Sequence, residues 1–252
     1  MKNPTQSLAA WLGLGVAISL FWPLMSLRAA APKPETAKVE KADPAAHALL
    51  KAAHDKRETF PPNFAGFTAD VVFNDNGKMS TGELTYKPGS KSKVNVEGLN
   101  EETHGWLEDR LLSMLAHRQG RAFTESDGRH PITFGADDGS PLGRQLILHD
   151  ALQSTYRVRN DQIMDVTRTM GDTKFTITML ENIQTESGKY LPHHFVVSYF
   201  DAKSGALQMV EQYTDSYTKI GDIWLPTARR VIIAADGKMT VRVIELRDLK
   251  LL

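Results

Sequence analysis

The sequence has no cysteine among its 252 residues. This absence excludes disulfides, thiolate metal sites, a cysteine nucleophile and a lipid-modified N-terminal cysteine. Net charge is also absent, because 30 Lys and Arg residues balance 30 Asp and Glu residues. A neutral protein has no overall field that would attract nucleic acid, so we predict no nucleic-acid partner.

Complete catalytic and metal motifs are missing as well. No G-x-S-x-G nucleophile elbow occurs, and Ser187-Gly188-Lys189 lacks the earlier glycine of a phosphate-binding loop. The eight His residues do not have the spacing of metal ligands. The adjacent His193 and His194, for example, fall in a predicted strand, where neighbours point to opposite faces. We therefore predict no metal and no cofactor, and we favour a protein that is not an enzyme.

The longest apolar stretch of the chain lies at its N-terminus. Lys2 precedes an uncharged run from Asn3 to Leu27, and Ala29 to Ala31 follow. This order is typical of a signal peptide, but a helix of about 20 apolar residues can also anchor a protein in a membrane. We predict that residues 1–31 are a signal peptide or membrane anchor and that 32–43 are a polar linker. The protein is then exported and periplasmic or envelope-associated, with anchoring to the inner membrane as the alternative.

Residues 44–252 predict a single β-rich domain. Asp43-Pro44 is typical of a helix start, and from Gly66 onward apolar residues recur at every second position. Turn sequences such as Asn74–Gly77 separate the alternating segments at regular intervals. We predict an α+β fold that is mainly antiparallel β. In it, about ten strands by this pattern form a curved meander sheet, an open half-barrel, packed on one or two helices.

The segment from Asn100 to Arg118 predicts the main helix. Trp106, Leu111 and Leu115 lie on one side of it at helical spacing. A helix with one apolar side must pack on something, and the sheet is the expected partner.

Two sets of residues are candidates for a binding site. Apolar positions on the helix and strands have an ordinary interpretation as core, and a functional one as the lining of an apolar pocket. These candidate ligand-binding residues are Phe67, Val71, Trp106, Leu111, Leu115, Phe175, Ile177 and Trp224. The second set, His117, Arg118 and Arg121, is a candidate site for an anion or head group. Its ordinary interpretation is that cations are favoured at a helix C-terminus.

Four segments carry a resemblance to a known family: Ala53 to Thr85, Leu111 to Phe123, Tyr156 to Ile177 and Tyr217 to Ile232. In order and spacing they resemble a bacterial family of unknown function, found in cyanobacteria and planctomycetes. The resemblance extends over nearly the whole chain from about residue 46. It implies no catalytic residue, because no activity is established for that family.

A second resemblance is at the level of pattern. The order of elements, the amphipathic helix and the late segment Ile220 to Pro226 are similar to periplasmic lipoprotein carriers of the LolA/LolB-like fold. That fold implies an antiparallel sheet that curls around helices and holds acyl chains in an apolar concavity.

These observations leave three functional hypotheses. The first is a non-catalytic binding protein or carrier for an apolar ligand, such as a lipid or acyl chain. The alternatives are an envelope-associated protein-interaction module and, less favoured, a hydrolase that uses His117 with Arg118. The sequence predicts neither the ligand nor the oligomeric state.

Overall fold

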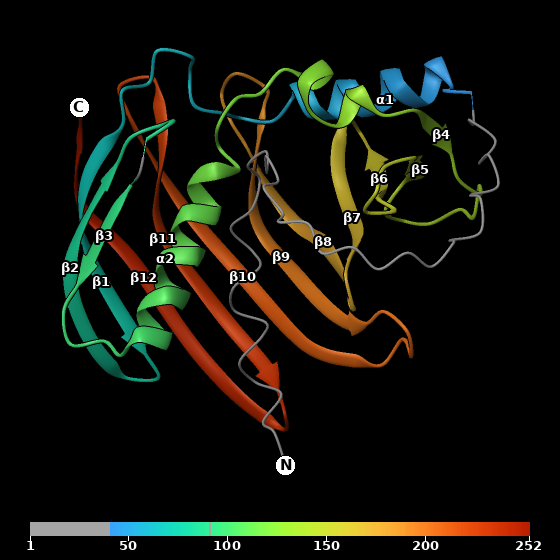
Figure 1. Cartoon of the computed structure of the whole chain (residues 1–252). Coiled ribbons are helices and arrows are strands. Elements are labelled where there is room, and N and C mark those ends of the chain that lie inside the picture. The colour runs from blue at the N-terminus through green and yellow to red at the C-terminus, as the bar shows by residue number, and fades with distance from the viewer. Residues whose placement is uncertain (1–40, 91) are drawn as a thin grey trace, which may run out of the picture.

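The computed structural model describes residues 41–90 and 92–252, and within them twelve strands form one antiparallel sheet (Figure 1). The strand order is β3-β2-β1-β12-β11-β10-β9-β8-β7-β6-β5-β4. The strands are β1 (Phe67–Asp75), β2 (Lys78–Tyr86), β3 (Lys93–Val96), β4 (Ile132–Phe134), β5 (Arg144–Leu148), β6 (Thr155–Arg159), β7 (Gln162–Met170), β8 (Thr173–Gln184), β9 (Tyr190–Asp201), β10 (Leu207–Ile220), β11 (Ile223–Ala235) and β12 (Lys238–Leu251). The predicted signal segment and the linker up to residue 40 lie outside the described residues.

The antiparallel meander is confirmed, with one difference in the strand number. The sequence predicted about ten strands, whereas the described residues form twelve. One strand that the pattern did not reveal is β5, where Leu146, Ile147 and Leu148 follow one another without alternation. Periodicity does not distinguish such a short apolar run from other structures.

Tight turns join neighbouring strands. Asn76 and Gly77 have φ values of 50° and 95° between β1 and β2, and Asp236 and Gly237 have 50° and 70° between β11 and β12. Positive φ at both central positions is the geometry of a type I′ hairpin turn, whose twist matches that of the flanking strands. The Asn-Gly and Asp-Gly sequences therefore fix the register of these hairpins.

Two α-helices lie in the described part of the chain, α1 (Pro44–Asp55) and α2 (Glu101–Ala116). The Asp43 side chain accepts hydrogen bonds from the N–H groups of Ala45 and Ala46, and the Asn100 side chain accepts one from Thr103. These N-caps satisfy donors that the first turn leaves free, so each helix begins where the sequence predicted. Two 3-10 turns follow α2, namely η2 (Phe123–Glu125) and η3 (Asp127–Arg129).

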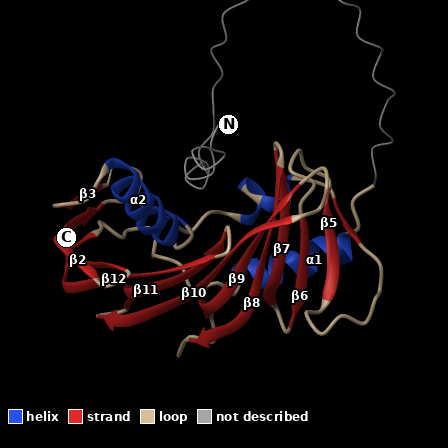
Figure 2. Cartoon of the chain, turned by 90° about the horizontal axis from the view of Figure 1, so that it is seen from below, coloured by secondary structure: helices blue, strands red, loops and turns tan. Residues whose placement is uncertain are grey.

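Both helices cover the same face of the curved sheet, which we call the concave face (Figure 2). Two apolar cores lie on this face. The larger core joins α2 to β1, β2 and the long strands, and includes Phe67, Leu107 and Leu111. The smaller core joins α1 and η2 to strands β4 to β6, and includes Leu50 and Leu146. The connection from β3 to β4 therefore runs across the concave face and carries α2 with it.

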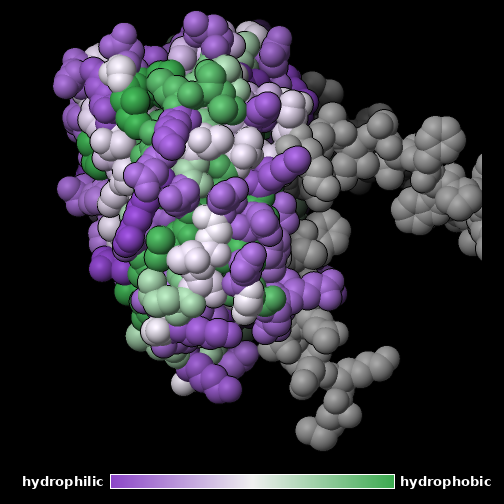
Figure 3. Space-filling model, turned by 90° about the vertical axis from the view of Figure 1, so that its left-hand side faces the viewer, coloured by the Kyte–Doolittle hydropathy of each residue, from purple (hydrophilic) through white to green (hydrophobic). Residues whose placement is uncertain are grey.

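The end of the sheet that contains β1, β2 and β3 has a mixed surface. In Figure 3 hydrophobic patches lie among hydrophilic side chains on this side. Met79, Leu251 and Leu252 are among the exposed apolar residues of β2 and the C-terminus. No helix in the described part of the chain has the length and apolarity needed to cross a membrane.

Candidate functional site

The candidate ligand-binding residues gather at one place in the fold. Six of the eight are buried in the larger core between α2 and the sheet: Phe67, Val71, Trp106, Leu111, Leu115 and Phe175. Ile177 packs against that core and is partly exposed, and Trp224 is partly exposed on β11. Because these six side chains are buried, a ligand on this face would contact Ile177 and its neighbours first. Their role in binding stays a prediction.

Ile177 belongs to a band of partly exposed apolar side chains where the two cores meet. Val166 lies opposite Ile177 across β7 and β8, so both side chains point to the concave face. Met170 and Phe195 are partly exposed on the same face, and Met170, Ile177 and Phe195 pack against the larger core. We call these four residues the central strip. Apolar surface of the concave face reaches solvent here.

Ion pairs lie buried beside the central strip. The Arg110 side chain on α2 donates to Glu211 Oε1 on β10 at 2.7 Å. The hydroxyls of Tyr199 and Tyr213 donate to Glu211 Oε2 at 2.9 and 2.6 Å. Burial raises the pKa of both tyrosines, and the charge of Glu211 raises it further, so they stay protonated as donors. Every oxygen of the buried carboxylate therefore has a partner.

A second pair lies beside the first. Arg229 on β11 donates through Nε and Nη2 to the two oxygens of Asp215, at 2.7 and 2.6 Å. Its Nη1 donates to the backbone carbonyl of Arg110 at 3.0 Å. A two-point contact of this kind is specific in geometry as well as strong. The two pairs fix α2 to β10 and β11 and hold the floor of the concave face in place.

The chain segments that follow the two helices also meet on the concave face. The Phe60 N–H donates to the Arg118 carbonyl at 2.6 Å, and Arg118 Nε donates to the Glu58 carbonyl at 3.0 Å. The segment after α1 is tied to the sheet as well, because the Glu58 N–H donates to the Tyr190 carbonyl at 2.8 Å. We call residues 56–60 and 117–119 together the helix-end junction.

Arg118 is a structural part of this junction. It is 3% exposed, donates through Nη2 to the Trp224 carbonyl at 3.1 Å and lies over the Phe60 and Tyr217 rings. Its Nη1 is buried and makes no hydrogen bond within the described residues. At the predicted anion site, Arg118 is therefore buried, and its Nη1 is the one nitrogen of its guanidinium without a partner in the described residues. Arg121, by contrast, is exposed in the loop beyond the junction.

His117 is the accessible member of the junction. Its Nδ1 donates to the Ser113 carbonyl at 2.8 Å, which leaves the Nε2 lone pair free for a ligand or proton. Desolvation lowers the pKa of His117, and the positive charges of Arg229, Arg57 and Arg168 lower it further. Arg229 and Arg168 are already paired with Asp215 and Asp127, so Arg57 remains, of the three, the candidate cation for an anionic ligand.

Arg57 is a contributor that the sequence analysis did not identify. It follows α1, is partly exposed, and its Nε donates to the His54 carbonyl at 3.2 Å. Nothing local in the sequence marks it, because its proximity to His117 depends on how the two helix ends meet. The buried Arg229 and Glu211 did leave a signal. Each occupies a strand position whose alternate neighbours, Val231 and Tyr213, are buried core residues.

Two surface pockets lie elsewhere. One, of about 430 Å³, is lined by the ends of β10, β11 and β12, including Leu207 and Met239. The other, of about 250 Å³, lies beside α2 and includes Tyr86 and Glu108. Neither is lined by a candidate ligand-binding residue. Among the described residues, no three His, Asp or Glu side chains lie close enough together to hold a metal ion.

Comparisons with known proteins agree with the first resemblance. A family model described as "Protein of unknown function (DUF3386)" matches residues 41–252. No curated protein matches the sequence.

Solved structures show only a distant likeness. A domain named for outer membrane lipoprotein sorting, from Vibrio parahaemolyticus, is 9% identical over 82% of this chain and 92% of that chain, with a TM-score of 0.32. A DUF1329 family protein from Desulfovibrio piger is 10% identical over 84% and 94% of the two chains, with a TM-score of 0.26. The Pseudomonas aeruginosa MucA/MucB complex is 9% identical over 82% and 99%, with a TM-score of 0.19. Scores this low carry no argument about function, which must rest on the chain's own residues.

Proposed function

Because the chain belongs to the DUF3386 family, whose function is unknown, we propose from its own residues that it is an exported binding protein or carrier for an amphiphile. The ligand would have an apolar chain and an anionic head group. The central strip would contact the chain, and the helix-end junction would contact the head group. Export rests on the N-terminal signal pattern.

One observation carries this proposal. Partly exposed apolar side chains of the central strip lie on the concave face, and the partly exposed Arg57 belongs to the junction where the ends of α1 and α2 meet. Binding sites for small molecules combine mostly apolar walls with a few placed polar groups. Arginine forks match carboxylate and phosphate groups, so a fatty acid or a phospholipid supplies the complementary chemistry.

The buried ion pairs support the same function. They fix α2 against β10 and β11 without occupying the central strip. A binding face held in one geometry loses less conformational entropy when the ligand arrives. The candidate residues of the larger core, such as Leu111 on α2 and Phe67 on β1, then support the binding face.

The test is native mass spectrometry of the full chain, expressed in a bacterial host and followed by organic extraction. We expect an added mass that resolves into a lipid, and uptake of a fluorescent fatty acid after delipidation. Ile177→Lys on the concave face should weaken this uptake at least tenfold, about 1.4 kcal/mol. The matched control is Val196→Lys, because Val196 is also partly exposed but alternates with Val197 and points to the opposite face.

The head group is tested separately. Arg57→Gln should weaken binding of the fatty acid but leave binding of the corresponding fatty alcohol unchanged, since only the acid carries charge. A clean apo mass together with no uptake by delipidated protein would contradict the carrier function. Pull-downs for a protein partner would then be the next experiment.

A further inference from the structure

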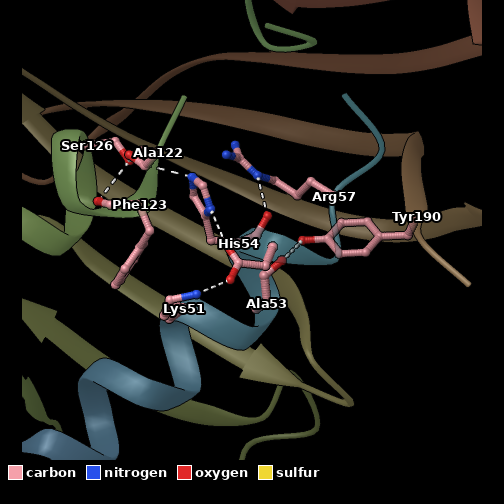
Figure 4. A network of polar contacts seen from close by, with 9 residues as sticks. Lys51, Ala53, His54, Arg57, Ala122, Phe123, Ser126 and Tyr190 are labelled. Atoms are coloured by element: carbon pink, nitrogen blue, oxygen red, sulfur yellow. Dashed lines mark hydrogen bonds and ion pairs between the residues drawn. The ribbon is translucent and has the colours of Figure 1, made fainter. Parts of the chain in front are cut away.

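A second imidazole, at the end of α1, lies between a hydroxyl and a carboxylate. His54 Nδ1 is 3.1 Å from Asp55 Oδ1, and His54 Nε2 is 3.5 Å from Ser126 Oγ (Figure 4). Ser126 lies between η2 and η3, 72 residues after His54, so the fold brings the two together. The order hydroxyl, imidazole, carboxylate is the arrangement that activates a serine as a nucleophile.

We propose that Ser126, His54 and Asp55 form a site for hydrolysis of carboxylic esters. Ser126 is the nucleophile, His54 the general base and Asp55 the positioning residue that holds the imidazole. This activity goes beyond ligand binding and uses residues outside the central strip.

The hydrogen bonds assign the proton positions. Asp55 Oδ1 can only accept, so Nδ1 carries the hydrogen and Nε2 presents its lone pair to Ser126. The second oxygen of Asp55 is paired with Lys51, which keeps the carboxylate charged. The Ser126 hydroxyl donates instead to the Ala122 carbonyl at 3.0 Å and to the Phe123 carbonyl at 3.2 Å. It would have to turn toward His54, and such contacts are often loose before the substrate binds.

The surroundings suit acyl transfer. His54 is 8% exposed, and Phe123 lies with its ring centroid 5.3 Å from the imidazole. Ser126 is partly exposed, so a substrate has access to the hydroxyl. Arg57 lies beside His54 in Figure 4, where its Nε donates to the His54 carbonyl at 3.2 Å. Desolvation and then Arg57 lower the pKa of His54, which favours the neutral base.

The reaction balances with water alone. Ser126 Oγ attacks the ester carbonyl carbon while its proton moves to His54 Nε2. The bond from this carbon to the alcohol oxygen breaks, and the alcohol leaves with that proton. Water then attacks the acyl-serine, gives one proton to His54 and releases the carboxylic acid, and the proton returns to Ser126 Oγ.

The chain offers a matched control on α2. Ser113 Oγ is also 3.5 Å from an imidazole nitrogen, His117 Nδ1, but that nitrogen donates to the Ser113 carbonyl. That nitrogen therefore carries a hydrogen and cannot accept the proton of the Ser113 hydroxyl. Ser113→Ala therefore removes a serine whose Oγ is as far from an imidazole nitrogen as that of Ser126. The nitrogen beside Ser113 carries a hydrogen, so it cannot act as the base.

The experiment treats the full chain with a fluorophosphonate probe and measures hydrolysis of p-nitrophenyl butyrate. We expect one label per chain on the peptide containing Ser126, and an initial burst of nitrophenol. Ser126→Ala and His54→Gln should lose the label and at least 100-fold in rate, whereas Ser113→Ala should keep both. Asp55→Asn should reduce the rate and change its pH profile, which a purely structural carboxylate would not do.

A second variant covers the event that Ser126→Ala fails to fold. Ser126→Cys keeps a nucleophile in place and should react with iodoacetamide faster than the same variant carrying His54→Gln. A wild-type chain that takes no probe, or a labelled chain whose label persists in Ser126→Ala, would overturn the proposal. An iodoacetamide rate independent of His54 would do the same.

Discussion

The two halves of the concave face handle buried charge in different ways. In the α2 half, which contains α2, β1 to β3 and β8 to β12, Asp215 and Glu211 each meet an arginine at 2.6 to 2.7 Å. In the α1 half, which contains α1, η2, η3 and β4 to β7, the buried His54 has contacts of 3.1 and 3.5 Å. Fully paired charges make a structure rigid, whereas loosely held titratable groups are typical of functional sites. The buried ion pairs therefore serve stability in the α2 half, whereas the site that we propose for chemistry lies in the α1 half.

The largest effect should come from breaking a pair in the α2 half. Arg229→Met leaves the Asp215 carboxylate, 1% exposed, without its two-point partner. We expect a loss of about 3–5 kcal/mol in the free energy of unfolding, because an unpaired charge would stay buried. Urea unfolding followed by circular dichroism measures this loss. The double variant with Asp215→Leu should recover much of it, and a cost of the single change below about 1 kcal/mol would refute the assigned role.

The next effect tests whether the halves unfold together. Leu111 and Leu50 are both fully buried, one in each core, so Leu111→Ala and Leu50→Ala make a matched pair. Each should cost about 2–5 kcal/mol by leaving a cavity. Hydrogen exchange followed by mass spectrometry shows which strands open. Because all twelve strands of the described region form one sheet, we expect each change to speed exchange in both halves. Faster exchange in β4 to β6 alone, after Leu50→Ala, would show that the halves open independently.

Local sequence patterns predicted the strands and the helix starts. Period-two alternation around Phe67 and Val71 predicted the strands, because a half-buried strand must alternate. The helix starts followed from the capping residues Asp43 and Asn100. These signals are local, so one sequence is enough to read them.

The sites depend on contacts between distant segments. Arg57 reaches the surroundings of His117 only because the ends of α1 and α2 meet, and Ser126 reaches His54 across 72 residues. No motif encodes either approach, since the intervening chain includes β1 to β3 and all of α2. The search for a nucleophile elbow therefore could not find Ser126. The sequence places His117 and Arg118 together at the end of a helix, but only the structure shows that one is exposed and the other buried.

The smallest effect should sharpen the comparison at His54. Desolvation and then Arg57 lower its pKa below the ordinary value of 6.5, while Asp55 and Asp127 partly oppose this shift. As the pH falls below about 6.5, the unfolded chain binds a proton that folded His54 resists, so this residue makes stability decrease toward acid pH. His54→Gln should therefore flatten the dependence of the unfolding free energy on pH between about 7 and 5, in urea titrations at several pH values. His117 also has a lowered pKa, so His117→Gln should flatten this dependence in the same direction. If His54→Gln kept the wild-type slope, His54 would have the same proton affinity in the folded and unfolded chains, and the α1 half would lose the feature that sets it apart.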